Sequence, residues 1–280
     1  MRIYLSGVEV GLHTLEAAML ARPPNLLMSY FSRDRLGTKV DPVMYAAESR
    51  LVDSGAYSFL YGGAAGVDFD AYLAGYADWL VRRIRLGLTD WFIEMDIARL
   101  TSPAWVERQR RFMIARGLGP KMITVWHSEM SWSDWVYLLD EASRPGRSRY
   151  VAIEGRHGDR AEIDYGRFVA AAYARGVRVH GFMLTGREIL ESVPFYSVDS
   201  TSWATVAMYG TVHELGRYAV TTVQRSRTSK APPVGTASRA YVKPLAESIR
   251  AWVEAGRRLT SMWEARGIDW EGAIRSAEAT

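Results

Sequence analysis

The sequence predicts a parallel α/β fold, a closed (β/α)8 TIM-like barrel followed by a C-terminal helix. Short apolar runs recur eight times along the chain, and helical stretches separate many of them. No glycine motif of a dinucleotide-binding or P-loop protein follows the first run, where the segment Val8–Gly11 stands instead. This absence favours a closed barrel over an open, doubly wound sheet.

The predicted strands are rich in Val, Ile, Phe and Tyr and nearly continuous in apolar character. Strands that are buried on both faces of a sheet have this composition. The predicted ranges are Arg2–Val8, Asn25–Phe31, Arg50–Asp53, Trp91–Ile97, Lys121–His127, Tyr150–Glu154, Val177–Leu184 and Phe195–Asp199.

The predicted helices between these strands carry recognisable ends. Asp68 and Ser102 suit N-caps, Pro103 suits a first helical position, and Gly117 and Gly176 suit helix ends. The predicted ranges are His13–Ala21, Phe69–Leu86, Ser102–Arg116, Ser131–Ser143, Ile163–Arg175 and Arg187–Ser192. A last amphipathic helix is expected over about 244–266, and its buried side would include Leu245, Ile249, Trp252, Val253, Leu259, Met262 and Trp263.

Length and composition predict one globular domain over residues 1–280. The chain has no Cys, which excludes a disulfide scaffold, a Cys-ligated zinc site and a thiol nucleophile. Hydrophobic residues make up 48% and charged residues 24%, which argues against disorder. No apolar run approaches the roughly 18 residues of a membrane span, and the N-terminus does not resemble a signal peptide. We therefore expect a soluble protein without a membrane partner, located in the cytoplasm (the host cytoplasm if phage-encoded).

The charge balance fits a polyanionic partner without establishing one. The net charge is +4 and the pI is about 9.3. A stretch at about 224–243 is rich in Ser, Thr, Pro and basic residues, and it is either a phosphate-binding loop or a solvated one. Its basic residues are Arg225, Arg227, Lys230, Arg239 and Lys243.

Carboxylates follow the apolar residues of four predicted strands, namely Asp53, Asp96, Glu154 and Asp199. A carboxylate at the end of a buried strand is costly unless it is hydrogen-bonded or functional, and capping the next helix is the alternative role. In a barrel, all four would meet at the C-terminal rim, where catalytic residues lie. Paired carboxylates suit double displacement at an anomeric carbon, in which one attacks the carbon and the other moves the proton.

At these residues the chain resembles the tRNA-guanine transglycosylases. The segment Val52–Tyr57, V-D-S-G-A-Y, resembles the family's D-S-G-[GA]-[FY] motif, and Val198–Asp199 resembles the position of its nucleophile. Met95–Asp96 resembles the strand end that reads the purine edge. Glu154–Gly155 lies where the family has Gln-Gly, and Gly181–Gly186 is similar in place to its glycine-flanked pocket segment. The resemblance covers roughly residues 50–205.

Two departures point to one branch of that family. The tRNA enzymes carry a C-terminal zinc site built from Cys and His, which a chain without Cys lacks, and they are longer. The segment Val198–Trp203 also resembles the compact phage branch, the DpdA-like DNA-guanine transglycosylases, more than the tRNA enzymes.

The resemblance implies that the enzyme replaces guanine in DNA with a free 7-deazaguanine base such as preQ0, without a cofactor or a metal. Asp199 would be the nucleophile and Asp53 the general acid/base. The implied substrate-binding residues are Ser54, Gly55, Tyr57, Asp96, His127, Glu154, Gly155, Met183, Leu184 and Trp203. Glu94 alternates with Asp96, so both are candidates to face inward. His157, Asp159 and Glu162 form too sparse a set to predict a metal site.

Three alternatives stay open at this point. The first is exchange into tRNA, and DNA is preferred because the zinc subdomain is missing and a tight fit against Trp203 or Tyr57 would exclude a 2′-hydroxyl. The second is a non-catalytic barrel that binds nucleic acid. The third is a glycoside hydrolase that uses the same carboxylates.

Overall fold

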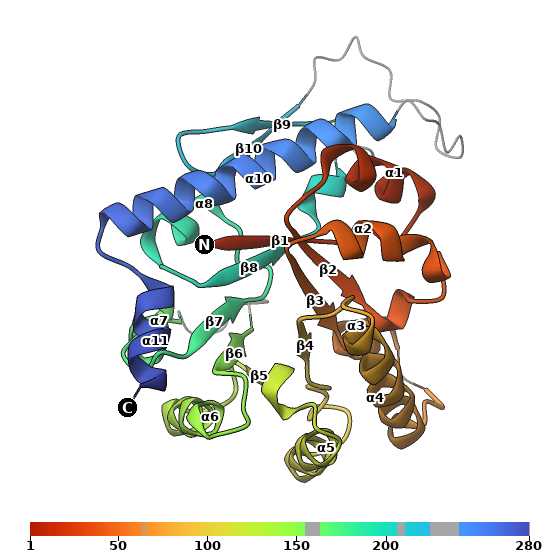
Figure 1. Cartoon of the computed structure of the whole chain (residues 1–280), viewed down its shortest axis with the longest axis vertical. Coiled ribbons are helices and arrows are strands. Elements are labelled where there is room, and N and C mark those ends of the chain that lie inside the picture. Colours follow the sequence, from red (N-terminus) through yellow and green to blue (C-terminus); the bar gives the residue numbers. More distant parts are fainter. Residues whose placement is uncertain (64, 155–162, 206–210, 225–240, 280) are drawn as a thin grey trace.

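The computed structural model describes residues 1–63, 65–154, 163–205, 211–224 and 241–279. Eight parallel strands close into a barrel in sequence order, with β8 pairing with β1 (Figure 1). The barrel strands are β1 (Arg2–Ser6), β2 (Asn25–Ser29), β3 (Ser49–Asp53), β4 (Trp91–Ile93), β5 (Met122–Trp126), β6 (Tyr150–Ile153), β7 (Arg178–Gly181) and β8 (Ser197–Ser200). The predicted fold class is confirmed, and each predicted strand overlaps one observed strand.

Helices surround the barrel and cover the outer faces of its strands (Figure 1). They are α1 (Leu12–Ala21), α2 (Asp41–Ala46), α3 (Ala56–Gly62), α4 (Phe69–Arg85), α5 (Pro103–Ala115), α6 (Trp132–Ser143), α7 (Tyr165–Tyr173), α8 (Arg187–Ser192), α10 (Val242–Ala265) and α11 (Trp270–Glu278). Short 3₁₀ turns cover Tyr30–Ser32, Gly37–Val40, Gly119–Lys121 and Ser202–Ala204. The sequence interpretation missed α2, α3 and α11.

The helix ends follow the side-chain chemistry that the sequence indicated. The Asp68 side chain accepts the N–H groups of Asp70 and Ala71 at the start of α4, and Ser102 accepts the N–H of Trp105 at the start of α5. Each cap satisfies backbone donors that a first helical turn leaves unpaired. After α5, Gly117 has a φ of 76°, a left-handed conformation that favours glycine.

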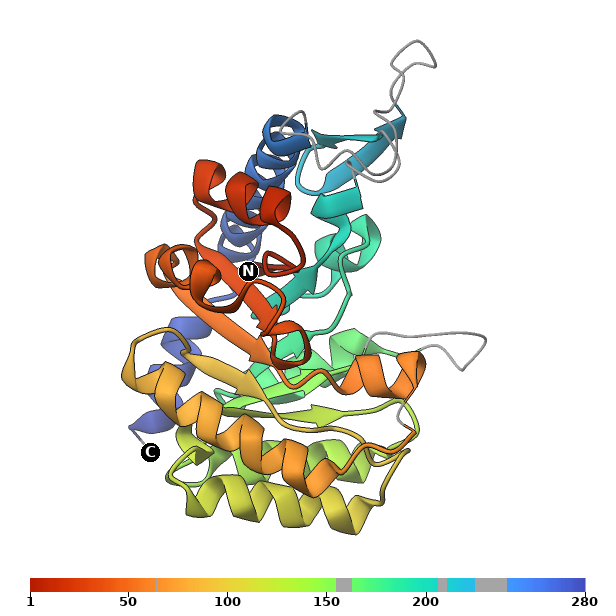
Figure 2. The ribbon, with the colours of Figure 1, turned by 90° about the vertical axis from the view of Figure 1, so that its right-hand side faces the viewer.

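Helix α10 and a hairpin complete the ring after β8. Strands β9 (Thr211–Leu215) and β10 (Val220–Gln224) form the antiparallel hairpin, which the sequence interpretation also missed. His213 of β9 contacts Ser248 Oγ of α10 through Nδ1 at 2.5 Å. Figures 1 and 2 show α10 lying alongside α1, and Leu245, Ile249, Trp252, Leu259 and Met262 of its apolar side are buried. The predicted C-terminal helix is confirmed.

Polar aromatic residues fill the barrel interior beneath its C-terminal mouth. The hydroxyl of Tyr4 on β1 lies 2.7 Å from Ser49 Oγ on β3, and the hydroxyl of Tyr150 on β6 lies 2.5 Å from Ser197 Oγ on β8. Both contacts skip the strand between, so these side chains point inward. Tyr4 and Tyr150 are fully buried, so they belong to the packed interior of the barrel.

Among the helices of the described ranges, none combines the length and the apolar character needed to cross a membrane.

Candidate functional site

A cavity of about 390 Å³ opens at the carboxyl ends of the barrel strands. Five carboxylates line it: Glu9, Asp53, Asp96, Glu154 and Asp199. His127 also lines it, and no Lys or Arg is among its lining residues in the described part of the chain. The cavity therefore suits neutral or cationic chemical groups that carry N–H or O–H donors, and it disfavours phosphate.

Asp53 is the last residue of β3 and faces this cavity. Its Oδ2 accepts the N–H of Gly55 at 2.8 Å and the Ser29 hydroxyl at 3.4 Å. Burial raises the pKa of Asp53 to about 7, and the negative charges of Asp96 and Asp199 add to this effect. A carboxyl with a pKa near neutrality can both give and take a proton at physiological pH.

Gly55 fixes the backbone beside Asp53, where β3 turns into α3. Its φ is 89°, and a Cβ atom at this position would lie 2.5 Å from the Cβ of Phe31. Both the left-handed conformation and this close approach require glycine. The D-S-G segment is therefore a tight turn that directs a backbone N–H at the Asp53 carboxylate.

Asp199 lies on β8, next to β1, and is 7% exposed. Its Oδ1 accepts the N–H of Met183 at 3.0 Å. Met183 has a φ of 54°, an uncommon conformation for a residue with a side chain. This backbone arrangement after β7 holds one carboxylate oxygen of Asp199, so Oδ2 is the oxygen left for a ligand.

A chain of buried polar groups lies behind Asp199. His180 is fully buried, with Nε2 3.5 Å from Asp199 Oδ1 and Nδ1 2.7 Å from Ser197 Oγ. The Tyr150 hydroxyl lies 2.5 Å from Ser197 Oγ, and burial raises the pKa of Tyr150 well above its usual value. Tyr150, Ser197 and His180 therefore form one chain of polar contacts that ends at Asp199.

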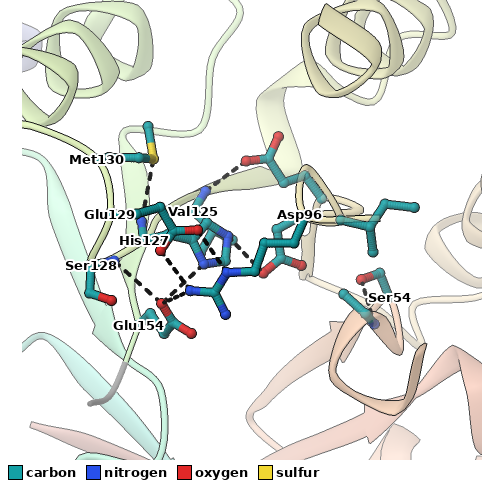
Figure 3. Close-up of polar contacts among 12 residues, drawn as sticks. Ser54, Asp96, Val125, His127, Ser128, Glu129, Met130 and Glu154 are labelled. Atoms are coloured by element: carbon teal, nitrogen blue, oxygen red, sulfur yellow. Dashed lines mark hydrogen bonds and ion pairs between the residues drawn. The ribbon is translucent and has the colours of Figure 1, made fainter. Parts of the chain in front are cut away.

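His127 links two carboxylates on the opposite part of the rim (Figure 3). Its Nε2 lies 3.3 Å from Asp96 Oδ2, and its Nδ1 lies 3.2 Å from Glu154 Oε2. Burial opposes the charge of the ring, but the hydrogen bonds to Asp96 and Glu154 outweigh it and raise the pKa of His127 to about 10. His127 is therefore a cation at neutral pH that fixes both carboxylates.

Arg99 extends this network towards solvent. Its guanidinium pairs with Glu129 at 2.6 Å and with Glu154 at 3.3 Å. Ligand atoms of His127, Glu129 and Glu154 lie close enough together to hold a metal ion. Because two cationic side chains already pair with these carboxylates, we propose no metal there, and the expected absence of a metal stays a prediction.

Glu94 does not face the cavity, contrary to one reading of its alternation with Asp96. It is fully buried and bonded to Arg110 of α5 through Nε at 2.5 Å, to Gln109, and to the backbone N–H of Val125 at 2.7 Å. Strand β4 ends at Ile93, so the strict alternation of a strand no longer applies beyond that residue. Glu94 therefore holds α5 against the barrel.

The remaining residues of the predicted site divide into two groups. Tyr57, which is 51% exposed, and Met183 line the rim of the cavity together with Asp96, His127 and Glu154. Ser54, Leu184 and Trp203 are not among the cavity-lining residues. Trp203 is fully buried and donates from Nε1 to the Ser6 carbonyl at 2.9 Å, so it is part of the core and not a wall of the site.

Most of the predicted nucleic-acid residues lie outside the described ranges. They are Arg225, Arg227, Lys230 and Arg239. The predicted substrate-binding residue Gly155 and the sparse set of His157, Asp159 and Glu162 also lie outside the described ranges. Lys243 is exposed at the start of α10. The expectation that this basic stretch contacts phosphates stays a prediction.

Sequence reasoning missed Ser6, Glu9, Arg99 and His180 as site residues. Ser6 ends β1 and Glu9 follows three residues later, so the same strand-end rule that selected Asp53 would have found them. His180 lies within a predicted apolar strand, and no sequence pattern indicates that it would lie behind Asp199. Arg99 lies six residues beyond the end of β4. The strand-end rule does not reach that far, because the path of the loop decides where such a residue lies.

Comparison with models of known protein families found no match, and comparison with curated protein sequences found none either.

Proposed function

We propose that the protein is a pentosyltransferase that exchanges guanine in DNA for a 7-deazaguanine base of the preQ0 type. The observation that carries this proposal is the meeting of Asp53, Asp96 and Asp199 in one cavity, with the pKa of Asp53 near 7. The residues of the D-S-G-A-Y segment and of the Val198–Trp203 segment supply the resemblance to guanine transglycosylases. Geometry and motif support the same assignment of roles.

Asp199 acts as the nucleophile in this proposal. The Met183 N–H holds Oδ1, so Oδ2 attacks C1′ of the target nucleotide. The bond between C1′ and N9 breaks with its electron pair moving to the base, and protonated Asp53 gives the leaving guanine a proton. An ester between Asp199 and C1′ remains.

The second half of the reaction reverses these roles. The incoming base loses its N9 proton to ionised Asp53, its N9 attacks C1′, and Asp199 leaves as a carboxylate. One glycosidic bond replaces a similar one, so the exchange balances without an oxidant, a reductant or ATP. A pKa near 7 lets Asp53 serve in both directions.

Asp96 and its neighbours select the base. Asp96 Oδ2 is engaged by His127, which leaves Oδ1 to accept N1–H and the exocyclic amine of a guanine-like edge. Adenine lacks this pair of donors and would leave Asp96 Oδ1 without a hydrogen-bond donor. The absence of Lys and Arg from the described cavity lining supports a neutral base as the occupant and argues against a phosphate there.

DNA is the proposed polymer, with tRNA as its rival. A chain without Cys lacks the zinc subdomain that extends the tRNA enzymes. Trp203 lies in the core, so it cannot exclude a 2′-hydroxyl and gives no support for DNA over tRNA. In a duplex the target nucleotide has to be flipped out, at a cost of a few kcal/mol, so single-stranded DNA should react more readily.

The direct experiment supplies radiolabelled guanine with single-stranded DNA, duplex DNA or tRNA at one fixed salt concentration, because binding to phosphates weakens with salt. The expected result is incorporation into DNA and its later loss when unlabelled preQ0 is added. Incorporation into tRNA alone would move the enzyme to the tRNA branch. A matched Glu107→Gln variant, changed at a half-exposed residue of α5 that does not line the cavity, should keep wild-type activity.

A further inference from the structure

Two buried polar atoms on the β1 side of the cavity have no hydrogen-bond partner within the described residues. They are Ser6 Oγ and Glu9 Oε2. Glu9 is 2% exposed, Ser6 is 6% exposed, and both line the cavity. A buried polar group without a partner costs free energy, so these two atoms indicate that a ligand supplies the missing partners.

The chemistry of Glu9 is set by its other oxygen and by its burial. Oε1 accepts the N–H of Ser29 at 2.9 Å, so it acts as the carbonyl-type oxygen of the carboxyl group. Burial raises the pKa of Glu9, and the N–H groups of Ser29 and of Glu9 itself only partly oppose this. In the neutral acid the proton lies on Oε2, which then presents an O–H donor to the cavity. Ser6 presents a second hydroxyl donor.

The order of the strands locates these donors relative to the proposed chemistry. Strands β8, β1, β2 and β3 are successive neighbours, and Tyr4 of β1 pairs with Asp199 of β8. Ser29 at the end of β2 contacts both Glu9 and Asp53. Ser6 and Glu9 therefore lie on the arc between Asp199, which attacks C1′, and Asp53, which protonates the base leaving C1′.

We propose that Ser6 and Glu9 form the seat of the target nucleotide's pentose, with Glu9 donating a hydrogen bond from Oε2 to a sugar oxygen. This proposal rests on the proposed base exchange. Within a DNA strand the oxygens of a deoxyribose, O3′, O4′ and O5′, are all acceptors, so a seat made of O–H donors fits them. The base itself lies further round the rim, against Asp96 and His127.

Equilibrium binding tests the seat separately from catalysis. All proteins carry Asp199→Asn, which blocks adduct formation, and the protein with this change alone is the parent. The variants Glu9→Ala, Glu9→Gln and Ser6→Ala are made in this parent. For each protein we measure the affinity for a guanine-containing DNA oligonucleotide, without an incoming base, and separately the affinity for free guanine. Glu9→Ala should weaken oligonucleotide binding about tenfold and Ser6→Ala severalfold, the loss expected for one hydrogen bond with a neutral acceptor. Binding of free guanine should stay within about twofold.

The Glu9→Gln variant decides which atom faces the ligand. With its carbonyl on the Ser29 N–H, Gln presents an NH₂ donor, so it should bind the oligonucleotide within about threefold of the parent. The exposed Glu16 of α1 supplies the matched control, Glu16→Gln, which should leave both affinities unchanged. Circular dichroism verifies that each variant is folded. If Glu9→Ala does not fold, Ser6→Ala still tests the seat.

Three results would overturn the seat. The first is that Glu9→Ala and Ser6→Ala both bind the oligonucleotide as tightly as the parent or more tightly, and the second is that a variant loses more affinity for free guanine than for the oligonucleotide. The third is that Glu9→Gln and Glu9→Ala lose the same affinity for the oligonucleotide. The last result would mean that Glu9 accepts a donor, such as a ribose 2′-hydroxyl or a cationic amine. Failure of the base exchange itself has a different signature, because wild type would then incorporate no labelled guanine while the binding comparison still reports on Glu9.

Discussion

The two sides of the cavity hold their carboxylates in opposite ways. On the β4–β6 side, Asp96 and Glu154 are paired with His127, and Arg99 adds a second cation. On the β8–β3 side, no salt bridge within the described residues ends on Asp53 or Glu9, and the pKa of each is raised by burial. Carboxyls at similar strand ends therefore differ in their salt-bridge partners and in the direction of their pKa shifts.

This difference assigns separate tasks to the two sides. Carboxylates with fixed cationic partners keep one charge and one orientation, which suits recognition of a base edge. Carboxyls that are buried without a salt-bridge partner have raised pKa values, which suits proton transfer and hydrogen-bond donation. Substitutions on the unpaired side should therefore affect catalysis most, and substitutions on the paired side should affect base binding and pH-dependent stability.

The largest effect is expected from Asp199→Asn. An amide cannot form the covalent intermediate, so the rate of guanine incorporation should fall by at least about a thousandfold. The variant should also fail to form a protein–DNA adduct on a denaturing gel, while it still binds guanine and DNA. An adduct at wild-type yield would remove Asp199 from the nucleophile's role.

The next largest effect is expected from Asp53→Asn. Loss of a general acid/base should lower the rate about 10²- to 10⁴-fold. In wild type, the adduct-forming step needs protonated Asp53, so its rate should fall as pH rises above about 7. The residual adduct formation of the variant should lose this pH dependence in rapid-quench measurements. An unchanged pH profile in Asp53→Asn would assign the titration to another group.

The fold was predictable from the sequence because its signals are local. Apolar strands such as Tyr150–Ile153 and capped helices such as α4 can be identified residue by residue. The hairpin β9–β10 was missed because its segments are short and polar, with His213 and Glu214 in the first. Helix α2 was missed because it has only six residues and follows a 3₁₀ turn.

The candidate site was predictable only in part. The strand-end rule found Asp53, Asp96, Glu154 and Asp199 because it needs only the order of strands. It did not show that Glu94 turns towards Arg110 or that Trp203 lies in the core, since both depend on packing between distant segments. The pairing of His127 with two carboxylates likewise depends on the closure of β4, β5 and β6 into one barrel.

On the paired side, Asp96→Asn should weaken base binding without a matching loss of DNA binding. The amide presents a donor or a neutral acceptor where the carboxylate accepted two N–H groups, so the KM for guanine should rise about 10- to 100-fold. The KM for the oligonucleotide should change less than about threefold. Separate titration of the two substrates measures both values, and an unchanged guanine KM would place the base elsewhere in the cavity.

The smallest effect, and the one that compares the two sides directly, is the pH dependence of stability. The pKa of His127 in the folded protein is about 10, against an ordinary value of 6.5, so its contribution is complete below about pH 6.5 and is lost as pH rises towards 10. The pKa of Asp53 is raised from 3.8 to about 7, so the folded protein keeps a proton that the unfolded chain has lost, and stability falls as pH rises between about 4 and 7. Each group alone contributes a slope of at most about 1.4 kcal/mol per pH unit within its window. Denaturant titrations from pH 5 to 9 should therefore show that Asp53→Asn flattens the decline below pH 7 and His127→Gln flattens the decline above it. If His127→Gln flattened neither part of the curve, the ring would not be held as a cation between Asp96 and Glu154, and the paired side would lose its distinguishing feature.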